Sequence, residues 1–235
     1  MELLEQIKER YLDRLSPATF RSRLFWKTVE GLALSPLNRP QWKADRVSLA
    51  YFLRATRDAY LRRAPVVWCN LLTPSELVLG SGCIPFYPEM AAAVAASAGL
   101  APRFIDRAAE EEFPSDACSY HRCLLGCALE GFLPEPDLLL AVNYPCDSAP
   151  LSFAFLGDLY HAPLFVLEAP LPGRERGVEE LAGRMAEAAR AMAGLSGRGE
   201  REMMEGLSAA VDLSNRALHH LRDVEEMRKR DDCTL

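Results

Sequence analysis

Cysteine is the residue type through which this sequence could do the most chemistry. The chain has seven cysteines, Cys69, Cys83, Cys118, Cys123, Cys127, Cys146 and Cys233. An odd number excludes a complete disulfide framework within one chain, and in a reducing compartment such a set indicates metal, cluster or redox chemistry. Free cysteine is also a common small core residue, so packing is the alternative for each of them taken alone.

Two of the cysteines stand where a ligand is expected. Cys146 lies in the loop after the apolar run of residues 138–142, and ligands of open α/β sheets collect at the carboxyl ends of strands. Cys118 lies at the expected start of a helix, whose N-terminus stabilises anions and suits a thiolate ligand of iron. Cys123 and Cys127 share a face of that helix; they could bind a metal, but packing against the sheet is favoured.

Several other kinds of site are disfavoured. The sequence has no Cys-x-x-Cys and no His-x-x-x-His pair, so a zinc finger or ribbon is not expected. It has neither of the standard glycine-rich phosphate loops, which argues against a built-in ATPase or dinucleotide site. The nucleophile elbow of serine hydrolases is absent as well.

The middle of the chain has the pattern of a parallel sheet. Residues 138–142 form a continuous apolar run, typical of a strand buried on both faces. A loop, a helix over residues 149–160 and a strand over residues 164–167 follow, and residues 66–69 also have strand character. The sequence therefore predicts an α/β fold, with a parallel sheet layered with helices.

Helix signals flank these strands. Thr73-Pro74-Ser75-Glu76 predicts a helix start, with Thr73 as the cap and Glu76 closing a capping box. A short apolar stretch over residues 84–87 precedes a helix that begins at Pro88, and Gly99 is placed to end it. Apolar residues at helical spacing predict long helices near the C-terminus, with their methionines on packing surfaces.

These elements divide the chain into three predicted segments. Residues 1–65 form a helical N-terminal extension, in which apolar residues from Leu3 to Leu15 recur at helical spacing. Residues 66–172 form the α/β domain. Residues 173–235 form a helical C-terminal segment that we expect to lead into a second domain.

The charge of the chain limits its partners. It carries 27 Lys and Arg against 33 Asp and Glu, a net charge of −6, which disfavours a nucleic-acid ligand. Residues 1–65 have 13 basic and 7 acidic side chains (+6), and the remainder has 14 and 26 (−12). The basic segment could face an acidic partner or the phosphate groups of a ligand, although a solvated helical face is favoured. Charged residues at the N-terminus disfavour a signal peptide, and no apolar run is long enough to span a membrane.

Five ordered segments of the chain resemble the successive motifs of one protein family. They are Thr73-Pro74-Ser75-Glu76-Leu77, Gly82-Cys83-Ile84-Pro85-Phe86-Tyr87-Pro88-Glu89, Cys118-Ser119-Tyr120-His121-Arg122 with Gly126, Pro136-Asp137-Leu138, and Asn143-Tyr144-Pro145-Cys146-Asp147. In order and spacing they resemble the subunits of 2-hydroxyacyl-CoA dehydratases and benzoyl-CoA reductases. The resemblance covers about residues 66–170.

The resemblance implies a cytoplasmic, oxygen-sensitive iron–sulfur protein with a Rossmann-like parallel sheet, which works as a pair of related subunits. It implies a [4Fe–4S] cluster held by cysteines, or a double-cubane cluster, and an acyl-CoA substrate. A separate ATP-hydrolysing activator protein, with its own cluster, would supply a low-potential electron. One-electron reduction of the acyl-CoA to a ketyl radical anion would then make expulsion of hydroxide feasible.

By motif, the resemblance implies Cys118 and Cys146 as cluster ligands. The third cysteine of the family comes from a second domain, so Cys83 is the expected substitute and Cys233 is an alternative. Arg122 would neutralise cluster charge or hold a CoA phosphate, with a surface ion pair as the alternative. Asp147 beside Cys146 is either a cofactor-binding residue or a helix cap.

The sequence therefore predicts an iron–sulfur subunit, or its N-terminal part, of an enzyme that dehydrates or reduces an acyl-CoA thioester. Activity of this chain alone is not expected. The first alternative is a non-catalytic scaffold of the same fold that docks a catalytic paralogue. The second is a plain α/β small-molecule-binding domain with packed cysteines. Acid–base roles for Glu76 and Glu89 stay open, because capping and a helix N-terminus explain these residues as well.

Overall fold

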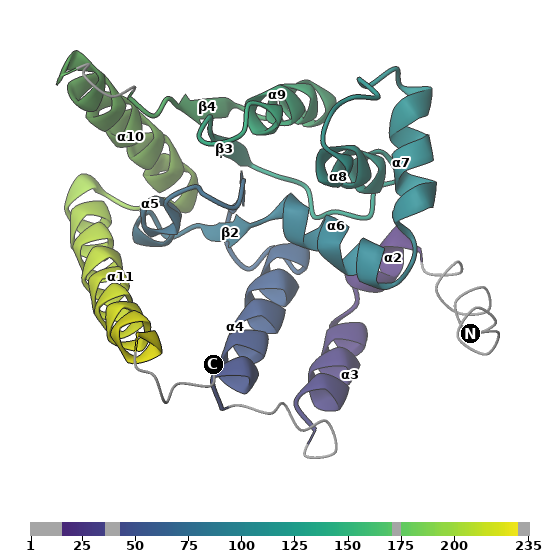
Figure 1. Cartoon of the computed structure of the whole chain (residues 1–235), viewed down its shortest axis with the longest axis horizontal. Helices are drawn as coiled ribbons and strands as arrows, with labels where there is room; N and C mark the ends of the chain where they lie inside the picture. Colours follow the sequence, from purple (N-terminus) through teal and green to yellow (C-terminus); the bar gives the residue numbers. More distant parts are fainter. Residues whose placement is uncertain (1–15, 36–42, 171–174, 230–235) are drawn as a thin grey trace.

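The computed structural model describes residues 16–35, 43–170 and 175–229 (Figure 1). The predicted helical repeat from Leu3 to Leu15 lies outside these residues, as does Cys233. The described part of the N-terminal segment forms α2 (Pro17–Phe20), α3 (Arg23–Ala33) and α4 (Lys43–Tyr60). Its predicted helical character is confirmed for those residues.

Four parallel strands form one sheet in the order β2-β1-β3-β4. They are β1 (Val66–Cys69), β2 (Ile84–Phe86), β3 (Leu138–Val142) and β4 (Leu164–Leu167). The chain moves outward from β1 to β2 and then crosses back, so that β3 pairs with the other side of β1. The direction of winding reverses between β1 and β3, and the predicted α/β fold class is confirmed.

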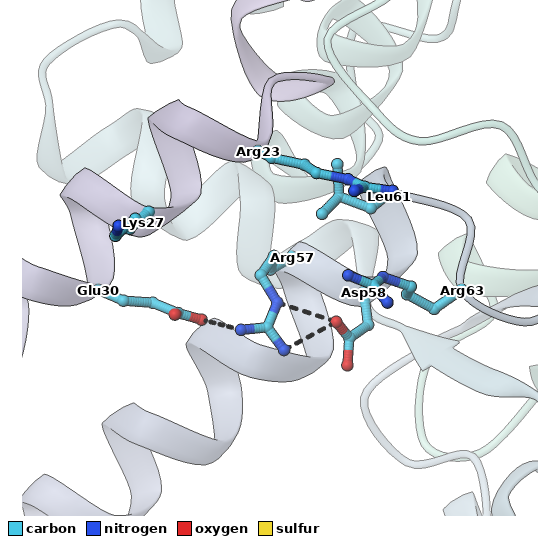
Figure 2. Close-up of a pocket in the computed structure, with 7 residues that line it drawn as sticks. All are labelled: Arg23, Lys27, Glu30, Arg57, Asp58, Leu61 and Arg63. Atoms are coloured by element: carbon cyan, nitrogen blue, oxygen red, sulfur yellow. Dashed lines mark hydrogen bonds and ion pairs between the residues drawn. The ribbon is translucent and has the colours of Figure 1, made fainter.

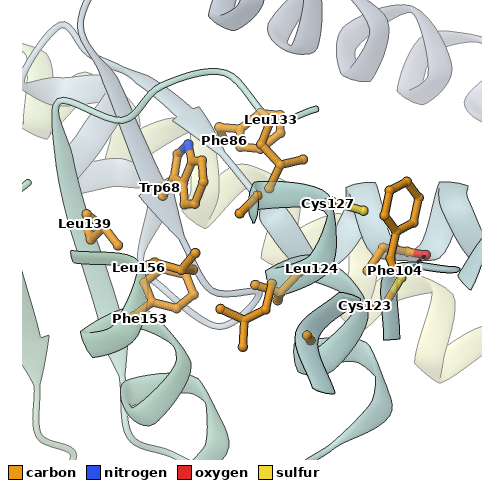
Figure 3. Close-up of a cluster of buried hydrophobic side chains, with 14 of the residues drawn as sticks. Trp68, Phe86, Phe104, Cys123, Leu124, Cys127, Leu133, Leu139, Phe153 and Leu156 are labelled. Carbon is orange, nitrogen blue, oxygen red and sulfur yellow. Dashed lines mark hydrogen bonds between the residues drawn. The ribbon is translucent and has the colours of Figure 1, made fainter. Parts of the chain in front are cut away.

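Alternating side chains of the strands divide the core into two clusters. On one face, Trp68 and Leu139 pack with residues of five helices. These are the end of α4, α6 (Pro88–Ser97), α7 (Ala101–Glu110), α8 (Ser119–Leu129) and α9 (Ser148–Tyr160). Figure 3 shows the aromatic and aliphatic side chains of this cluster between the strands and the helices. Because strand side chains point alternately to opposite faces, both faces of these apolar strands need a helical cover.

The other face is covered by α5 (Ser75–Gly80), α10 (Glu175–Ser196) and α11 (Glu200–Arg228). Met192 of α10 is fully buried against this face and Met203 of α11 is 5% exposed, so the predicted packing role is confirmed for these two methionines. The prediction is wrong for Met227 near the end of α11, which is 51% exposed. Farther along α11, Leu218 and Leu221 are exposed. Figure 1 shows α10 near β4 and α11 beside α5, with the two helices joined by a short turn at the left of the view. Within the described ranges, no helix is both long enough and apolar enough to cross a bilayer.

The N-terminal helices pack on the sheet layer through aromatic rings. The Phe20 ring stacks on the Tyr60 ring with a centroid distance of 5.4 Å, and the Trp26 ring lies 5.4 Å from the same ring. Trp26 Nε1 donates to the Phe20 carbonyl at 2.7 Å, so this buried indole has its partner. Tyr60 Oη donates to the Phe132 carbonyl at 2.7 Å and ties the end of α4 to the segment before β3.

The predicted capping box at residues 73–76 is wrong. The N-cap of α5 is Pro74, and no side chain caps this helix. The Thr73 hydroxyl instead donates to Asn70 Oδ1 at 2.5 Å and lies 3.1 Å from the Leu140 carbonyl oxygen. Thr73 is buried, and a buried hydroxyl is more costly to leave without a partner than an exposed helix end that water can satisfy. The Glu76 carboxylate accepts a hydrogen bond from Ser214 of α11.

Candidate functional site at the carboxyl edge of the sheet

All four strands end at the same edge of the sheet, where the loops after β1, β2, β3 and β4 meet. The reversal of winding between β1 and β3 opens a crevice at this edge in folds of this type. Helices α6 and α9 begin here, because each directly follows a strand. Helix α8 also begins on this side. Its C-terminal end leads to Phe132, whose carbonyl accepts a hydrogen bond from Tyr60 at the end of α4, and α4 leads into the start of β1. The C-terminus of α8 therefore lies toward the amino edge of the sheet and its N-terminus toward the carboxyl edge. Together with the short helix α5, which follows β1, four helix N-termini therefore lie along this edge.

The Asn70 side chain joins β1 to β3 at the reversal point. Its Oδ1 accepts from the Val142 N–H at 2.9 Å, and its Nδ2 donates to the Val142 carbonyl at 3.2 Å. The amide thus extends the backbone pairing of the two strands beyond Cys69. At the neighbouring pair of strands, β3 and β4, Asn143 Oδ1 accepts a hydrogen bond from the Ala169 N–H at 2.8 Å. This bond ties the loop after β3 to the loop after β4. Side-chain hydrogen bonds therefore hold the loops that carry the candidate residues.

The two principal cysteines of the prediction both lie on this side of the sheet. Cys146 is half-buried in the loop between β3 and α9. Cys118 is exposed and occupies the N-cap position of α8, confirming the predicted helix start. Both are free thiols, and each stands beside a helix N-terminus whose unpaired N–H groups favour an anion.

Cys83 lies at the opposite edge. It immediately precedes β2 and is 4% exposed, with its Sγ donating to the Met192 carbonyl of α10 at 3.4 Å. Burial raises the pKa of this thiol to about 11, which disfavours the thiolate that iron binds. Among the described residues, no three His, Cys, Asp or Glu side chains are grouped so that they could hold a metal ion. The structure therefore does not bring Cys83 together with Cys118 and Cys146.

Cys123 and Cys127 lie in the buried core, as the packing interpretation predicted (Figure 3). Cys123 is directed at the Ala92 carbonyl of α6, with a Sγ to O distance of 4.0 Å. The hydrogen bond with Cys123, together with burial, raises the pKa of the Cys127 thiol well above its ordinary range. These two side chains fill the space between α8 and its neighbours.

Arg122 and Asp147 lie beside the two principal cysteines. Arg122 Nη1 donates to the Ser115 carbonyl at 3.2 Å and so holds the loop before α8, while its Nε is buried without a partner in the described chain. The ion pairs found among the described residues do not include Arg122. Asp147 is exposed at the N-cap position of α9, but its side chain makes no capping hydrogen bond. The capping interpretation of Asp147 is thus wrong, and its carboxylate is available at the site.

Glu89 is a buried carboxyl group at the same edge. It lies in the first turn of α6, directly after β2, and is only 6% exposed. Burial raises its pKa to about 7, although the backbone N–H groups of Glu89 and Leu71 favour the ionised form. Its Oε2 atom has no partner within the described structure. A carboxyl group with a pKa near neutrality can both donate and accept a proton. The only sign of this role in the sequence is the position of Glu89 shortly after a predicted strand. An acidic residue there is also explained by the favourable effect of a helix N-terminus on a negative charge.

A family model of the 2-hydroxyglutaryl-CoA dehydratase D-component matches residues 70–235. The chain belongs to this family. The match confirms the resemblance and extends beyond it toward the C-terminus, because it covers α10 and α11 as well as β2, β3 and β4. A comparison with curated proteins finds no match.

The D-component match contains every residue of the candidate site. Asn70, Glu89, Cys118 and Cys146 all fall within residues 70–235, whereas α2, α3 and α4 lie outside them. Membership makes this chain a dehydratase component, and a component implies partner subunits. The candidate residues at the carboxyl edge of the sheet therefore all lie in the part of the chain that the family model matches.

Glu89→Gln should change the pH dependence of stability. Because the pKa of Glu89 is raised in the folded chain, the folded state binds the proton more tightly, and wild-type stability should fall as pH rises from about 4.5 to about 7. Gln is always neutral and should remove this loss, so that it stabilises the chain by up to about 3 kcal/mol at pH 8. Denaturant unfolding of both proteins at pH 4 and pH 8 measures the effect. Equal wild-type and variant stabilities at pH 8 would show that Glu89 is not held in a desolvating environment.

Proposed function

We propose that this chain is an iron–sulfur subunit of an enzyme that dehydrates a 2-hydroxyacyl-CoA thioester, or reduces a related acyl-CoA. The observation that carries the proposal is the position of Cys118 and Cys146, which lie within the family-matched residues as free thiols at helix N-termini along the carboxyl edge of the sheet. An ATP-hydrolysing activator protein is the proposed electron donor, and a related subunit is the proposed partner.

The residues at the edge suit a cluster in part. Two accessible cysteines can provide thiolate ligands, and the helix N-termini beside them provide a positive local potential for an anionic cluster. The described residues contain no third ligand in one group with them. The remaining ligands therefore come from a partner subunit or from outside the described residues, where Cys233 lies. When bound, a [4Fe–4S] cluster supplies one-electron chemistry at low potential and, with one iron left open, a coordination position.

The other residues of the edge would position the substrate and exclude water. Arg122 carries a buried Nε without a partner, which can bind an anionic group of the substrate or offset negative charge at the cysteines. Glu89 would exchange a proton with the substrate through its unpartnered Oε2. Leu71, Leu72 and Tyr144 expose large apolar side chains in the loops after β1 and β3. A partner subunit that covers them would keep water away from the reacting groups.

A non-catalytic scaffold is the second candidate function. The observation in its favour is that the described residues contain no complete ligand set. Such a subunit would keep the fold, bind a catalytic paralogue and contain no stoichiometric iron.

Iron and acid-labile sulfide per chain, measured on protein purified without oxygen, test the proposal. We expect about four irons and about four sulfides per chain after anaerobic reconstitution, alone or with the partner subunit, together with a broad visible absorption band. The reconstituted complex should turn over 2-hydroxyacyl-CoA only with an ATP-hydrolysing activator. Iron-free protein that still binds its partner would overturn the proposal in favour of the scaffold.

A further inference from the structure

A cavity of about 550 Å³ lies between α3 and α4, in the part of the chain that the family match does not cover. Figure 2 shows the side chains that line it. They are Arg23, Lys27, Glu30, Arg57, Asp58, Leu61 and Arg63. The end of α4 leads into the start of β1, so this cavity lies toward the amino edge of the sheet, away from the candidate dehydratase site.

The two carboxylates of the cavity are already bound to one arginine. Arg57 Nη1 lies 2.8 Å from Glu30 Oε1 of α3, and Arg57 Nη2 lies 2.9 Å from Asp58 Oδ1. All three side chains are less than about one-third exposed, and the hydrogen bond with Asp58 raises the pKa of Arg57. Figure 2 shows Arg57 between these two partners. This ion-paired group joins the two helices and carries one net negative charge.

Three cations of the cavity remain without a partner. The side chains of Arg23, Lys27 and Arg63 have no hydrogen bond or ion pair to any described residue, and all three are exposed at the rim. Together with the Arg57 group they give the cavity a net charge of +2. They also belong to the segment of residues 1–65 whose net charge is +6. Cations that face a concave surface without counter-ions attract a ligand with more than one negative charge.

The frame around the cavity is fixed. Arg62, next to Arg63, pairs with Asp137 Oδ1 at 2.6 Å, and Asp137 Oδ2 accepts from the Val66 N–H at 2.7 Å. Arg62 Nη1 also donates to the Glu135 carbonyl at 2.8 Å. The backbone that carries Arg63 is therefore tied to the starts of β1 and β3. The backbone of the site is thus preformed, and binding would order only the exposed cationic side chains.

We propose that this cavity binds the diphosphate group of a small ligand. Arginine and lysine donors suit phosphate oxygens, and a diphosphate matches the net charge of the cavity better than a single carboxylate does. Leu61 is the one apolar residue among those that line the cavity, so no aromatic surface is present there to hold a base. The group that is recognised is thus the diphosphate itself, which inorganic pyrophosphate, ADP and coenzyme A all carry. This inference does not depend on the proposed function.

Calorimetric titration of the full chain at low ionic strength, with pyrophosphate, ADP and coenzyme A in turn, tests the proposal. Lys27→Glu and Arg63→Glu should each weaken binding about tenfold or more, because each removes a charge-assisted contact and adds a repulsive charge. Arg54→Glu is the matched control, since Arg54 is exposed on α4, one of the two helices beside the cavity, and does not line the cavity. It should change the affinity less than about twofold, and circular dichroism should show that all variants are folded.

The outcomes separate the sources of the diphosphate. Similar affinities for all three probes support recognition of the diphosphate alone, and tighter binding of ADP or coenzyme A that is lost in Arg63→Glu supports the site and identifies the source. Equal weakening by Arg54→Glu would overturn the proposal, because it would indicate unspecific charge attraction. Failure of every probe to bind at millimolar concentration would overturn it too. A fourth titration, with poly-glutamate, would overturn it if poly-glutamate binds and the three diphosphates do not, because that result would indicate an acidic protein partner.

Discussion

Cys146→Ser and Cys118→Ser should each reduce the iron content of anaerobically reconstituted protein from about four atoms to less than about one per chain. Serine is a much poorer ligand of iron than a thiolate, and the described residues offer no nearby substitute. The fold should persist, because Cys118 is exposed and Cys146 is only half-buried. Iron analysis and the visible spectrum of each variant measure the loss, and the far-ultraviolet circular dichroism spectrum reports the fold.

Two further cysteine variants test whether the loss of iron is specific to Cys118 and Cys146. Cys123→Ala removes a buried thiol of the core and should lower stability by about 1 kcal/mol while leaving the iron content unchanged. Cys83→Ser tests the remaining predicted ligand, which lies at the amino edge of the sheet. A folded Cys83→Ser protein without iron would make Cys83 a ligand. Wild-type iron in both Cys118→Ser and Cys146→Ser would show that these cysteines hold no cluster.

Gly126→Ala should have the largest effect on stability. Gly126 lies in α8 where this helix crosses α7, and an added Cβ would lie 1.8 Å from the Phe104 carbonyl oxygen and 2.5 Å from its carbonyl carbon. Both atoms belong to the backbone, so no rotamer change relieves the clash and α7 must move. Because Phe104 is itself buried in the core, this movement should cost about 3 kcal/mol or more. Denaturant unfolding compared with the wild type measures the loss.

Gly183→Ala is the matched control for this prediction. Gly183 is also within a helix, α10, but an added Cβ there would meet nothing within 4 Å. Alanine is a better helix former than glycine, so this variant should gain up to about 1 kcal/mol. The two substitutions are chemically the same, but they should change the free energy of unfolding in opposite directions. If both stabilise the chain, α7 and α8 do not approach as closely as the structure shows.

The sequence by itself determined the secondary structure and much of the burial. The apolar runs at residues 66–69, 138–142 and 164–167 are strands, and the helix that begins at Pro88 ends before Gly99, whose φ is +70°. These predictions hold because strand and helix periodicity, proline and glycine act within a few residues. The packing of Cys123 and Cys127 was also predictable, since residues four apart in a helix share a face.

The tertiary structure decided which distant residues meet. No local pattern indicates that β3 pairs with β1 rather than with β2, and that pairing brings Asn70 and Thr73 to Leu140 and Val142. Thr73 has the local pattern of a helix cap, but a buried acceptor on a strand far away in sequence takes its hydroxyl. Local signals compete with long-range contacts, and the buried contact wins because an unsatisfied polar group costs more inside the protein than at its surface.

The tertiary structure also decides which of the candidate cysteine ligands lie on the same side of the sheet. Cys83 and Cys146 resemble each other in sequence, since each adjoins a strand, but one precedes its strand and the other follows it. In a parallel sheet these positions lie at opposite edges, so only the cysteine that follows its strand joins Cys118 on the side with the helix N-termini. Burial then sets the chemistry of Glu89, because its pKa depends on the backbone and side chains that the fold places around it rather than on its neighbours in sequence.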